Sequence, residues 1–225
     1  MTGNKDKALV LLSGGQDSTT CLYWAIDRFG RSAVSAISFD YGQRHRIELE
    51  CAEKIAADAG VEYSCLPIDT FSALGGDALT DPQVDIGDDI DTDTGLPNTF
   101  VPGRNLVFLT YAAAYAYQRG ISNLVTGVAQ ADYSGYPDCR EQTMESLQET
   151  LRLGMDSKVR IHAPLMHRSK KQTVELARDL GVLSVMAQTH TCYNGSRPPC
   201  GECPACKLRA KGFADAGIQD PLVIS

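Results

Sequence analysis

The run from Leu9 to Thr20, LVLLSGGQDSTT, joins an apolar strand to the start of a helix through two adjacent glycines. Glycine lets the backbone turn sharply and approach a ligand without a Cβ in the way. The unpaired N–H groups and the positive dipole end of the following helix point into the same space. Such a turn binds anions, and the hydroxyls beside it suit the phosphates of a nucleotide. A plain glycine turn with Asp17 and Ser18 as caps is the alternative.

This turn has neither the length nor the lysine of the kinase-type phosphate loop. It resembles the SGGxDS loop of the ATP pyrophosphatases, which cleave ATP to AMP and pyrophosphate. The resemblance implies that the loop holds pyrophosphate and that Asp17 lies near a Mg²⁺ ion bridging the phosphates. The predicted ATP-binding residues are the loop, the helix start and two outlying polar side chains: Leu12, Ser13, Gly14, Gly15, Gln16, Asp17, Ser18, Thr19, Thr20, Cys21, Leu22, Asp40 and Arg104.

Composition limits the partners of this chain. The 225 residues carry a net charge of −7, with a pI of about 5.1. A protein that grips a phosphate backbone usually shows a basic patch, so we expect no nucleic-acid partner. No apolar stretch approaches the roughly 20 residues that cross a bilayer, and no secretory leader is recognisable. We therefore expect a cytoplasmic protein without a membrane partner.

Strand-like and helix-like segments alternate along most of the sequence. This alternation predicts a parallel sheet with helices on both faces, and ligands of such sheets bind outside the carboxyl ends of the strands. The glycine turn lies at one of those ends. Predicted strands cover residues 8–12, 33–39, 61–68, 123–128 and 159–163, and predicted helices cover 18–29, 46–59, 104–118, 141–153 and 170–180.

Four of the eight cysteines fall in one short window, with the spacing C-x7-C-x2-C-x2-C over Cys192, Cys200, Cys203 and Cys206. Cytoplasmic thiols are expected to stay reduced, and four thiolates separated by turn-forming residues suit tetrahedral zinc. An iron–sulfur cluster is the alternative, because C-x2-C-x2-C also occurs in ferredoxin-like sites. Four thiolates close the coordination shell, so we predict a structural rather than a catalytic zinc ion.

We therefore predict an α/β fold, a doubly wound parallel sheet of the adenine nucleotide alpha-hydrolase type with a C-terminal zinc-binding segment. The ATP-binding domain would cover residues 1–185, and the zinc-binding segment, residues 186–225, would pack on it. Residues 75–98 interrupt the alternation and hold seven aspartates. Their spacing does not match a calcium loop, so we interpret this segment as a solvated insertion or an active-site lid.

Three polar positions outside the loop are candidates for chemistry. Arg104 begins a predicted helix, where a cation is unfavourable unless an anion is bound, so we expect it to contact phosphate. Asp132 follows the predicted strand 123–128 and could accept hydrogen bonds from a planar base; capping a helix is the alternative. Lys170 lies just inside another helix and could neutralise phosphate, although a lone lysine is usually solvated.

Longer motifs carry a resemblance to one family. LSGGQDSTTCL at 12–22 is accompanied by FDYGQRH at 39–45, FVPGRN at 100–105, DYSGYPDCR at 132–140 and CGECPACKLRAKGF at 200–213. Together they resemble the 7-cyano-7-deazaguanine synthase family of queuosine precursor biosynthesis. The resemblance implies an ATP-dependent ligase that converts 7-carboxy-7-deazaguanine and ammonia to the nitrile, through an adenylated carboxylate and an amide. It also implies a homodimer.

The resemblance further assigns roles to individual residues. The loop would hold pyrophosphate and Mg²⁺, two basic side chains would offset charge, and a carboxylate would read the guanine-like edge of the base. Lys171 and Gln172 follow Lys170 at positions where the resemblance leads us to expect a small residue and an acid. This departure weakens the assignment of Lys170. Cys139 is a weakly supported candidate nucleophile. The implied catalytic residues are Asp17 and Ser18, Arg104 and Lys170, and Asp132.

Two other functions stay open on the sequence. The same loop would serve another ATP-pyrophosphatase-type amidating or thiolating enzyme, as in NAD synthetase, GMP synthetase or tRNA-thiolating enzymes. The net charge of −7 speaks against a tRNA substrate. A non-enzymatic, zinc-stapled nucleotide sensor is the other alternative, and it should bind ATP without producing AMP.

Overall fold

The computed structural model describes residues 6–43, 46–71, 79, 94–130 and 136–224. One parallel sheet has the strand order β3-β2-β1-β4-β5. The order runs outward from β1 on one side and from β4 on the other, which places the switch point of a doubly wound sheet between them. The strands are β1 (Ala8–Leu11), β2 (Val34–Asp40), β3 (Glu62–Pro67), β4 (Asn123–Val125) and β5 (Arg160–His162).

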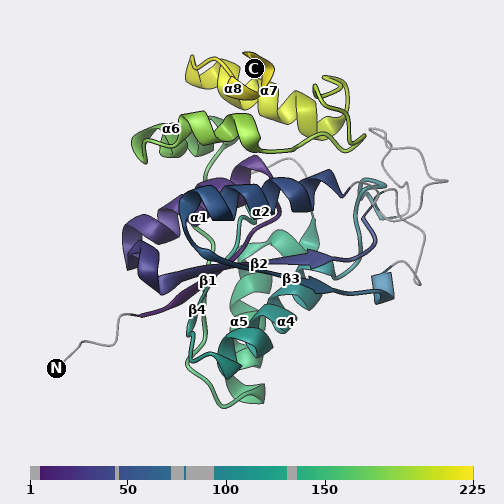
Figure 1. The fold of residues 1–225 in the computed structure, drawn as a ribbon. Helices are drawn as coiled ribbons and strands as arrows, with labels where there is room; N and C mark the ends of the chain where they lie inside the picture. Colours follow the sequence, from purple (N-terminus) through teal and green to yellow (C-terminus); the bar gives the residue numbers. More distant parts are fainter. Residues whose placement is uncertain (1–5, 44–45, 72–78, 80–93, 131–135, 225) are drawn as a thin grey trace.

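The helices form layers on the two faces of this sheet (Figure 1). Helices α1 and α2 cover one face, α4 and α5 cover the other, and α6, α7 and α8 form a further layer beyond α1. Their bounds are α1 (Gln16–Phe29), α2 (Ile47–Ala59), α4 (Arg104–Gln118), α5 (Glu141–Gly154), α6 (Lys170–Asp179), α7 (Pro204–Ala216) and α8 (Pro221–Ile224), with 3-10 turns η1 (Arg31–Ala33), η2 (Pro137–Cys139) and η3 (Leu183–Gln188).

Side chains on the two faces of β1 pack into two separate hydrophobic cores. Leu9 packs into the core that contains Leu109 of α4, whereas Val10 packs into the core with Leu22 of α1 and Ile55 of α2. All five side chains are fully buried. Because successive residues of a strand point to opposite faces, a sheet covered on both sides needs apolar residues at every position. This explains the unbroken apolar run before the glycine turn.

The predicted α/β fold and the order of its elements are confirmed. The strand predicted over 123–128 ends at Val125 in the structure, and Thr126, Gly127 and Val128, which follow it, line a cavity. The C-terminal segment, expected only as a zinc-binding tail, contains α7 and α8. Helix α7 packs on α6 through an apolar cluster that includes Val174, Met186 and Phe213.

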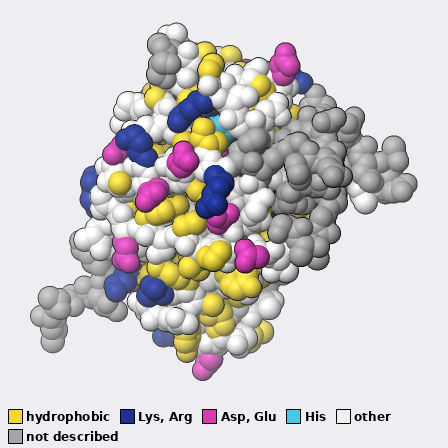
Figure 2. Space-filling view, turned by 45° about the vertical axis from the view of Figure 1, so that its right-hand side comes forward, with side chains coloured by type: hydrophobic (Ala, Val, Ile, Leu, Met, Phe, Trp, Pro, Cys, Tyr) yellow, Lys and Arg dark blue, Asp and Glu magenta, His cyan; other side chains and the backbone are white. Residues whose placement is uncertain are grey.

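Charged side chains of both signs are interspersed with apolar ones on the face shown in Figure 2. Within the described ranges, no helix combines the length and the apolar character that crossing a membrane requires.

Candidate active site

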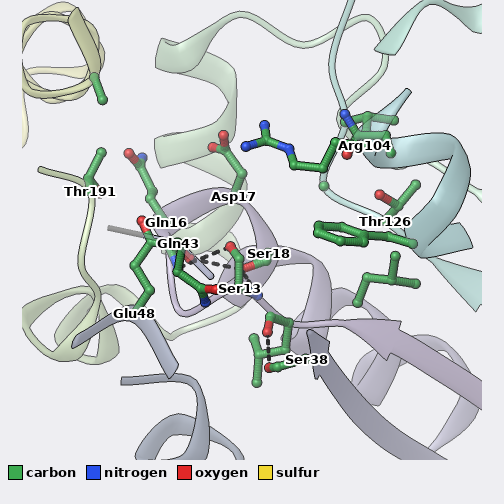
Figure 3. Close-up of a pocket in the computed structure, with 18 of the residues that line it drawn as sticks. Ser13, Gln16, Asp17, Ser18, Ser38, Gln43, Glu48, Arg104, Thr126 and Thr191 are labelled. Carbon is green, nitrogen blue, oxygen red and sulfur yellow. Dashed lines mark hydrogen bonds between the residues drawn. The ribbon is translucent and has the colours of Figure 1, made fainter. Parts of the chain in front are cut away.

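A cavity of about 350 Å³ opens at the carboxyl end of β1, beside the switch point of the sheet. Its walls come from the glycine turn, the first turns of α1, α2 and α4, and the segment leading to the cysteines (Figure 3). The labelled polar side chains of this cavity are Ser13, Gln16, Asp17, Ser18, Ser38, Gln43, Glu48, Arg104, Thr126 and Thr191.

Hydrogen bonds between two serines hold the turn after β1 in a tight curve. Ser18 Oγ accepts from the N–H of Ser13 at 3.1 Å, lies 3.0 Å from Ser13 Oγ, and donates to the carbonyl of Gly15 at 3.2 Å. Gly15 is the N-cap of α1, and no side chain caps this helix end. The N-terminus of α1 therefore faces the cavity without a capping side chain, as an anion site requires.

Gly14 fixes the position of this turn against α2. It has a φ of +82°, and a Cβ placed on it would lie 2.2 Å from the backbone oxygen of Glu48 and 2.9 Å from the amide nitrogen of Ala52. Its carbonyl accepts from the N–H of His190 at 2.9 Å. Glycine is required here both by the backbone conformation and by this close approach.

Asp17 and Lys170 meet at one wall of the cavity. Lys170 Nζ, at the start of α6, donates to Asp17 Oδ2 at 2.5 Å. The other carboxylate oxygen of Asp17 and Gln16 Nε2 are both buried, and neither has a hydrogen-bond partner among the described residues. Buried polar atoms are rarely left unpaired in a native protein. A carboxylate oxygen and an amide donor on the same cavity wall therefore fit a Mg²⁺ ion and a phosphate.

Arg104 projects from the first turn of α4 into the same space as Asp17 (Figure 3). Its Nη1 donates to Tyr41 Oη at 3.3 Å, and its guanidinium lies 5.8 Å from the centre of that ring. Burial disfavours the charged form, but Tyr41, Tyr193 and Tyr136 around it outweigh this effect and raise the pKa of Arg104. The cavity thus holds a permanent positive charge within an aromatic wall.

Asn105, next along α4, anchors the opposite loop. Its backbone N–H and its Nδ2 both donate to Asp138 Oδ2, at 3.0 and 3.1 Å, and Asp138 is buried. Asn105 Nδ2 also lies 3.4 Å from Cys139 Sγ. Cys139 lines the cavity, and its thiol is therefore held by an amide at the wall.

The four cysteines of the C-terminal window converge, and all four sulfur atoms lie within 4.8 Å of one another. Backbone N–H groups of Cys203 and Glu202 lower the pKa of Cys200 to about 6, whereas burial raises the pKa values of Cys203 and Cys206. Four sulfurs at this spacing fit an ion with metal–sulfur distances of about 2.3 Å. A divalent cation would also stabilise the buried thiolates. The four cysteines predicted as ligands thus lie together as a group that could hold a metal ion.

The cavity brings together part of the predicted ATP-binding set. Thr19, Thr20, Cys21 and Leu22 are instead buried within α1 and do not line it. Asp40 is also not a lining residue, and it pairs with Arg46 at 2.8 Å. The predicted residues that line the cavity are Leu12, Ser13, Gly15, Gln16, Asp17, Ser18, Arg104 and Lys170.

Two predictions fall on residues outside the described ranges. Asp132 is one of them, so its predicted contact with the base stays a prediction. The other is the acidic segment 75–98, of which only residues 79 and 94–98 are described.

Sequence reasoning missed Glu48, Thr191 and Tyr193, which all line the cavity. Glu48 lies in the first turn of α2, directly after the FDYGQRH motif. The sequence signal for Glu48 was its position shortly after this motif, which lies at the carboxyl end of a predicted strand. Thr191 and Tyr193 flank Cys192 and enter the cavity because the cysteine window lies beside it.

Comparisons with known proteins agree on one family. A family model described as "Queuosine biosynthesis protein QueC" matches residues 7–217. A 7-cyano-7-deazaguanine synthase of Chromobacterium violaceum is 66% identical over 97% of this chain and 93% of its own length. A second one, of Laribacter hongkongensis, is 64% identical over 97% of this chain and 94% of its own length.

The fold recurs in a distant solved structure. A protein of Methanocaldococcus jannaschii, described as a predicted subunit of tRNA methyltransferase, superposes with a TM-score of 0.50 at 18% sequence identity. The match covers 76% of this chain and 74% of that one. At this identity the likeness concerns the fold alone.

Proposed function

Because the chain belongs to the QueC family of queuosine biosynthesis proteins, we propose that it is an ATP-dependent ligase converting 7-carboxy-7-deazaguanine and ammonia to 7-cyano-7-deazaguanine. One observation carries the ATP part of this proposal. The SGGQDS turn, the uncapped start of α1, and the unpaired atoms of Gln16 and Asp17 all meet at one cavity wall.

The first step is adenylation of the substrate carboxylate. A carboxylate is a poor electrophile, and its conversion to an acyl adenylate supplies AMP as a leaving group. The turn and the start of α1 hold the pyrophosphate, while Lys170 and Arg104 offset the charge that develops on the phosphates. Asp17 and Ser18 would hold Mg²⁺, which supplies Lewis-acid stabilisation of the phosphoryl oxygens when bound.

Ammonia then displaces AMP to give the amide. A second ATP adenylates the amide oxygen and releases pyrophosphate; the C–O bond then breaks, AMP leaves with that oxygen, and the nitrogen loses its two protons to give the nitrile. We propose that Asp132 reads the guanine-like edge of the base and that Asp40 and the loop after β2 contribute to the nucleotide site. The aromatic wall formed by Tyr41, Phe39 and Phe108, with Phe39 and Phe108 stacked at 4.8 Å, supports a place for a planar base.

The four cysteines would hold a Zn²⁺ ion in a structural site. Their closed set of four sulfur ligands leaves no position for a substrate, which supports this role over a catalytic one. We further propose a homodimer located in the cytoplasm, on the basis of the family resemblance.

Incubation of the purified protein with Mg-ATP, ammonium and 7-carboxy-7-deazaguanine, followed by mass spectrometry, tests this function. We expect the nitrile together with AMP and pyrophosphate. AMP without nitrile would point to another amidating or thiolating enzyme, whereas absence of AMP would favour a nucleotide sensor.

The variant Asp17→Asn should abolish turnover, because the side chain proposed to bind Mg²⁺ and to pair with Lys170 loses its charge. Asp27→Asn, an exposed position on the same helix, is the matched control and should retain activity. Circular dichroism should show that both variants are folded. Retained turnover in Asp17→Asn would refute the proposed role of this carboxylate.

A further inference from the structure

Glu48 occupies a distinctive place beside the glycine turn. It lies in the first turn of α2, and its backbone oxygen is the atom that a Cβ on Gly14 would strike at 2.2 Å. Its side chain lines the cavity that also holds Asp17 and Arg104, and it points inward in Figure 3. The packing of α2 on the turn therefore fixes a carboxylate close to the proposed phosphate site.

This carboxylate has no polar partner in the part of the chain that the structure describes. The structure gives Glu48 neither a side-chain hydrogen bond nor an ion pair with any described residue, although the side chain is half-buried. Asp17, by comparison, is already tied to Lys170. Among the described carboxylates that line the cavity, Glu48 is thus the one available to take a proton.

The surroundings of Glu48 favour proton uptake. Burial raises the pKa of Glu48 to about 7, and Arg104 on α4 partly opposes this shift. Two neighbouring titratable groups feel the charge of Glu48, which helps to raise the pKa of the Tyr193 phenol and of the Cys51 thiol on its own helix. A base works best when its pKa lies near the working pH, and that condition is met here.

We propose that Glu48 is the proton acceptor for the nitrogen substrate, taking a proton from an ammonium ion so that ammonia can attack the activated carbonyl. This inference rests on the proposed function. Glu48 gains the proton and becomes a carboxylic acid, and the nitrogen lone pair is released. The new C–N bond forms at the carbonyl carbon, the C–O bond to AMP breaks, and AMP leaves with the electron pair. The attached nitrogen loses one proton to water, as Glu48 later does.

The alternative role for this side chain is to bind ATP, for example through the ribose hydroxyls. That role predicts a loss of adenylation, whereas a base for ammonium acts only after adenylation. The two roles are therefore separable by measuring the half-reactions. Formation of the acyl adenylate is followed as pyrophosphate release without ammonia, and amide formation is followed after ammonium is added.

The test compares Glu48→Gln with wild type and with Glu50→Gln, an exposed acid on the same turn of α2. We expect Glu48→Gln to release pyrophosphate at the wild-type rate but to form amide from ammonium at least about 100-fold more slowly. Hydroxylamine is already uncharged at neutral pH and needs no deprotonation. It should therefore restore the variant to a near wild-type rate, measured as hydroxamate. Glu50→Gln should match wild type in every assay.

The dependence on pH provides a second readout. In wild type, the rate of amide formation from ammonium should rise as the pH increases through about 7, and Glu48→Gln should lose this inflection. The folded carboxyl binds a proton at a pH where the unfolded one does not, so it costs stability as the pH rises toward 7. Glu48→Gln should therefore melt at a higher temperature than wild type at pH 8.

The possible results distinguish this inference from the proposed function. Equal losses of pyrophosphate release and amide formation in Glu48→Gln would overturn the role as a base and assign the residue to ATP binding. An equal defect with hydroxylamine and ammonium would overturn it as well. If wild type releases no pyrophosphate with 7-carboxy-7-deazaguanine, the proposed function itself fails.

Discussion

At the residue scale, the contact between Lys170 and Asp17 joins positions 153 residues apart in the chain. The side chain of Lys170 is only 13% exposed and that of Asp17 is 30% exposed. A pair at this depth is less screened than one on the surface. Under the proposed function, this ammonium group would move from the carboxylate to a phosphate oxygen when nucleotide enters.

Replacement of Lys170 by Met should reduce turnover at least about 100-fold, because one preorganised charge at the phosphates is removed. Lys171→Met is the matched control. Lys171 is half-exposed and lies 3.8 Å from Glu175, so its loss should change the rate less than about twofold, as expected for a surface pair. Steady-state kinetics with Mg-ATP as the varied substrate measures both effects. Equal rates in the two variants would contradict the role of Lys170.

The sequence predicts this residue only in part. The sequence indicates Lys170 as a lysine at the start of a helix, yet Lys171 and Gln172 weaken its assignment. In the structure Gln172 forms a capping box with Ser169, which fixes the start of α6 and thus the direction of Lys170. A capping box is readable from sequence, but the partner of the lysine is not, because it depends on how α6 packs on α1.

At the scale of elements, the strands and most helices can be predicted from the spacing of apolar residues and from the glycines that end helices. Apolar runs identify β1 and β2, and glycines end several helices, as Gly60 does in the left-handed conformation after α2. Helix α7 was missed because the cysteines before and at its start, together with its first residue, Pro204, indicate a metal loop. Proline is nevertheless well tolerated at the first position of a helix.

Helix α7 approaches α6 closely at Gly212. A Cβ at this position would lie 2.8 Å from Lys170 Cβ and 3.2 Å from the Lys170 carbonyl carbon. Gly212→Ala should therefore push the start of α6 away, lowering stability by about 1–3 kcal/mol through overpacking. It should also lower turnover, because Lys170 moves with the helix.

Gly154→Ala is the control for this change. Gly154 ends α5, and nothing lies within 4 Å of a Cβ placed there. Because alanine favours helix over glycine, this variant should keep full activity and be neutral or up to about 1 kcal/mol more stable. Urea unfolding and initial rates give both quantities. If Gly212→Ala were as stable and active as Gly154→Ala, the close packing of α7 on Lys170 would be refuted.

At the scale of the whole molecule, the C-terminal segment completes a cavity that begins at the N-terminal turn. Arg209 of α7 is 3% exposed, and it forms two hydrogen bonds with Asp220 at 2.6 and 2.8 Å. It also donates to Thr189 Oγ1 at 2.7 Å and to Thr191 Oγ1 at 3.1 Å. Because Thr191 lines the cavity, the tail holds part of the cavity wall in position.

We propose a division into residues 1–185 and 186–225. The two regions contact each other and are expected to depend on each other for stability. The sequence predicts two regions because the alternation of strands and helices stops before the cysteines. Their contact could not be predicted, because it rests on side chains such as Arg209 and Phe213 whose partners lie in η3 and α6. The apolar cluster beneath α7 predicts that the tail unfolds together with the rest of the chain.

Removal of the metal tests this dependence. The cysteine window is fixed to the rest of the protein by His190, whose N–H donates to Gly14, and by Cys192, which lines the cavity. Loss of the ion should therefore disorder Thr191 and Tyr193 and abolish turnover. The sheet should survive, because its two cores do not include the cysteine cluster.

We expect a strong chelator to lower the melting temperature and the turnover together, and Zn²⁺ to restore both. Cys203→Ser should lower the zinc content, measured by elemental analysis, and reproduce the chelated state. Cys65→Ser, at an exposed cysteine on β3, should leave zinc content and activity unchanged. Unchanged zinc in Cys203→Ser would overturn the ligand assignment. Full turnover after complete metal removal would instead show that the cavity wall stands without the ion, held by Arg209 and the packing of α7 alone.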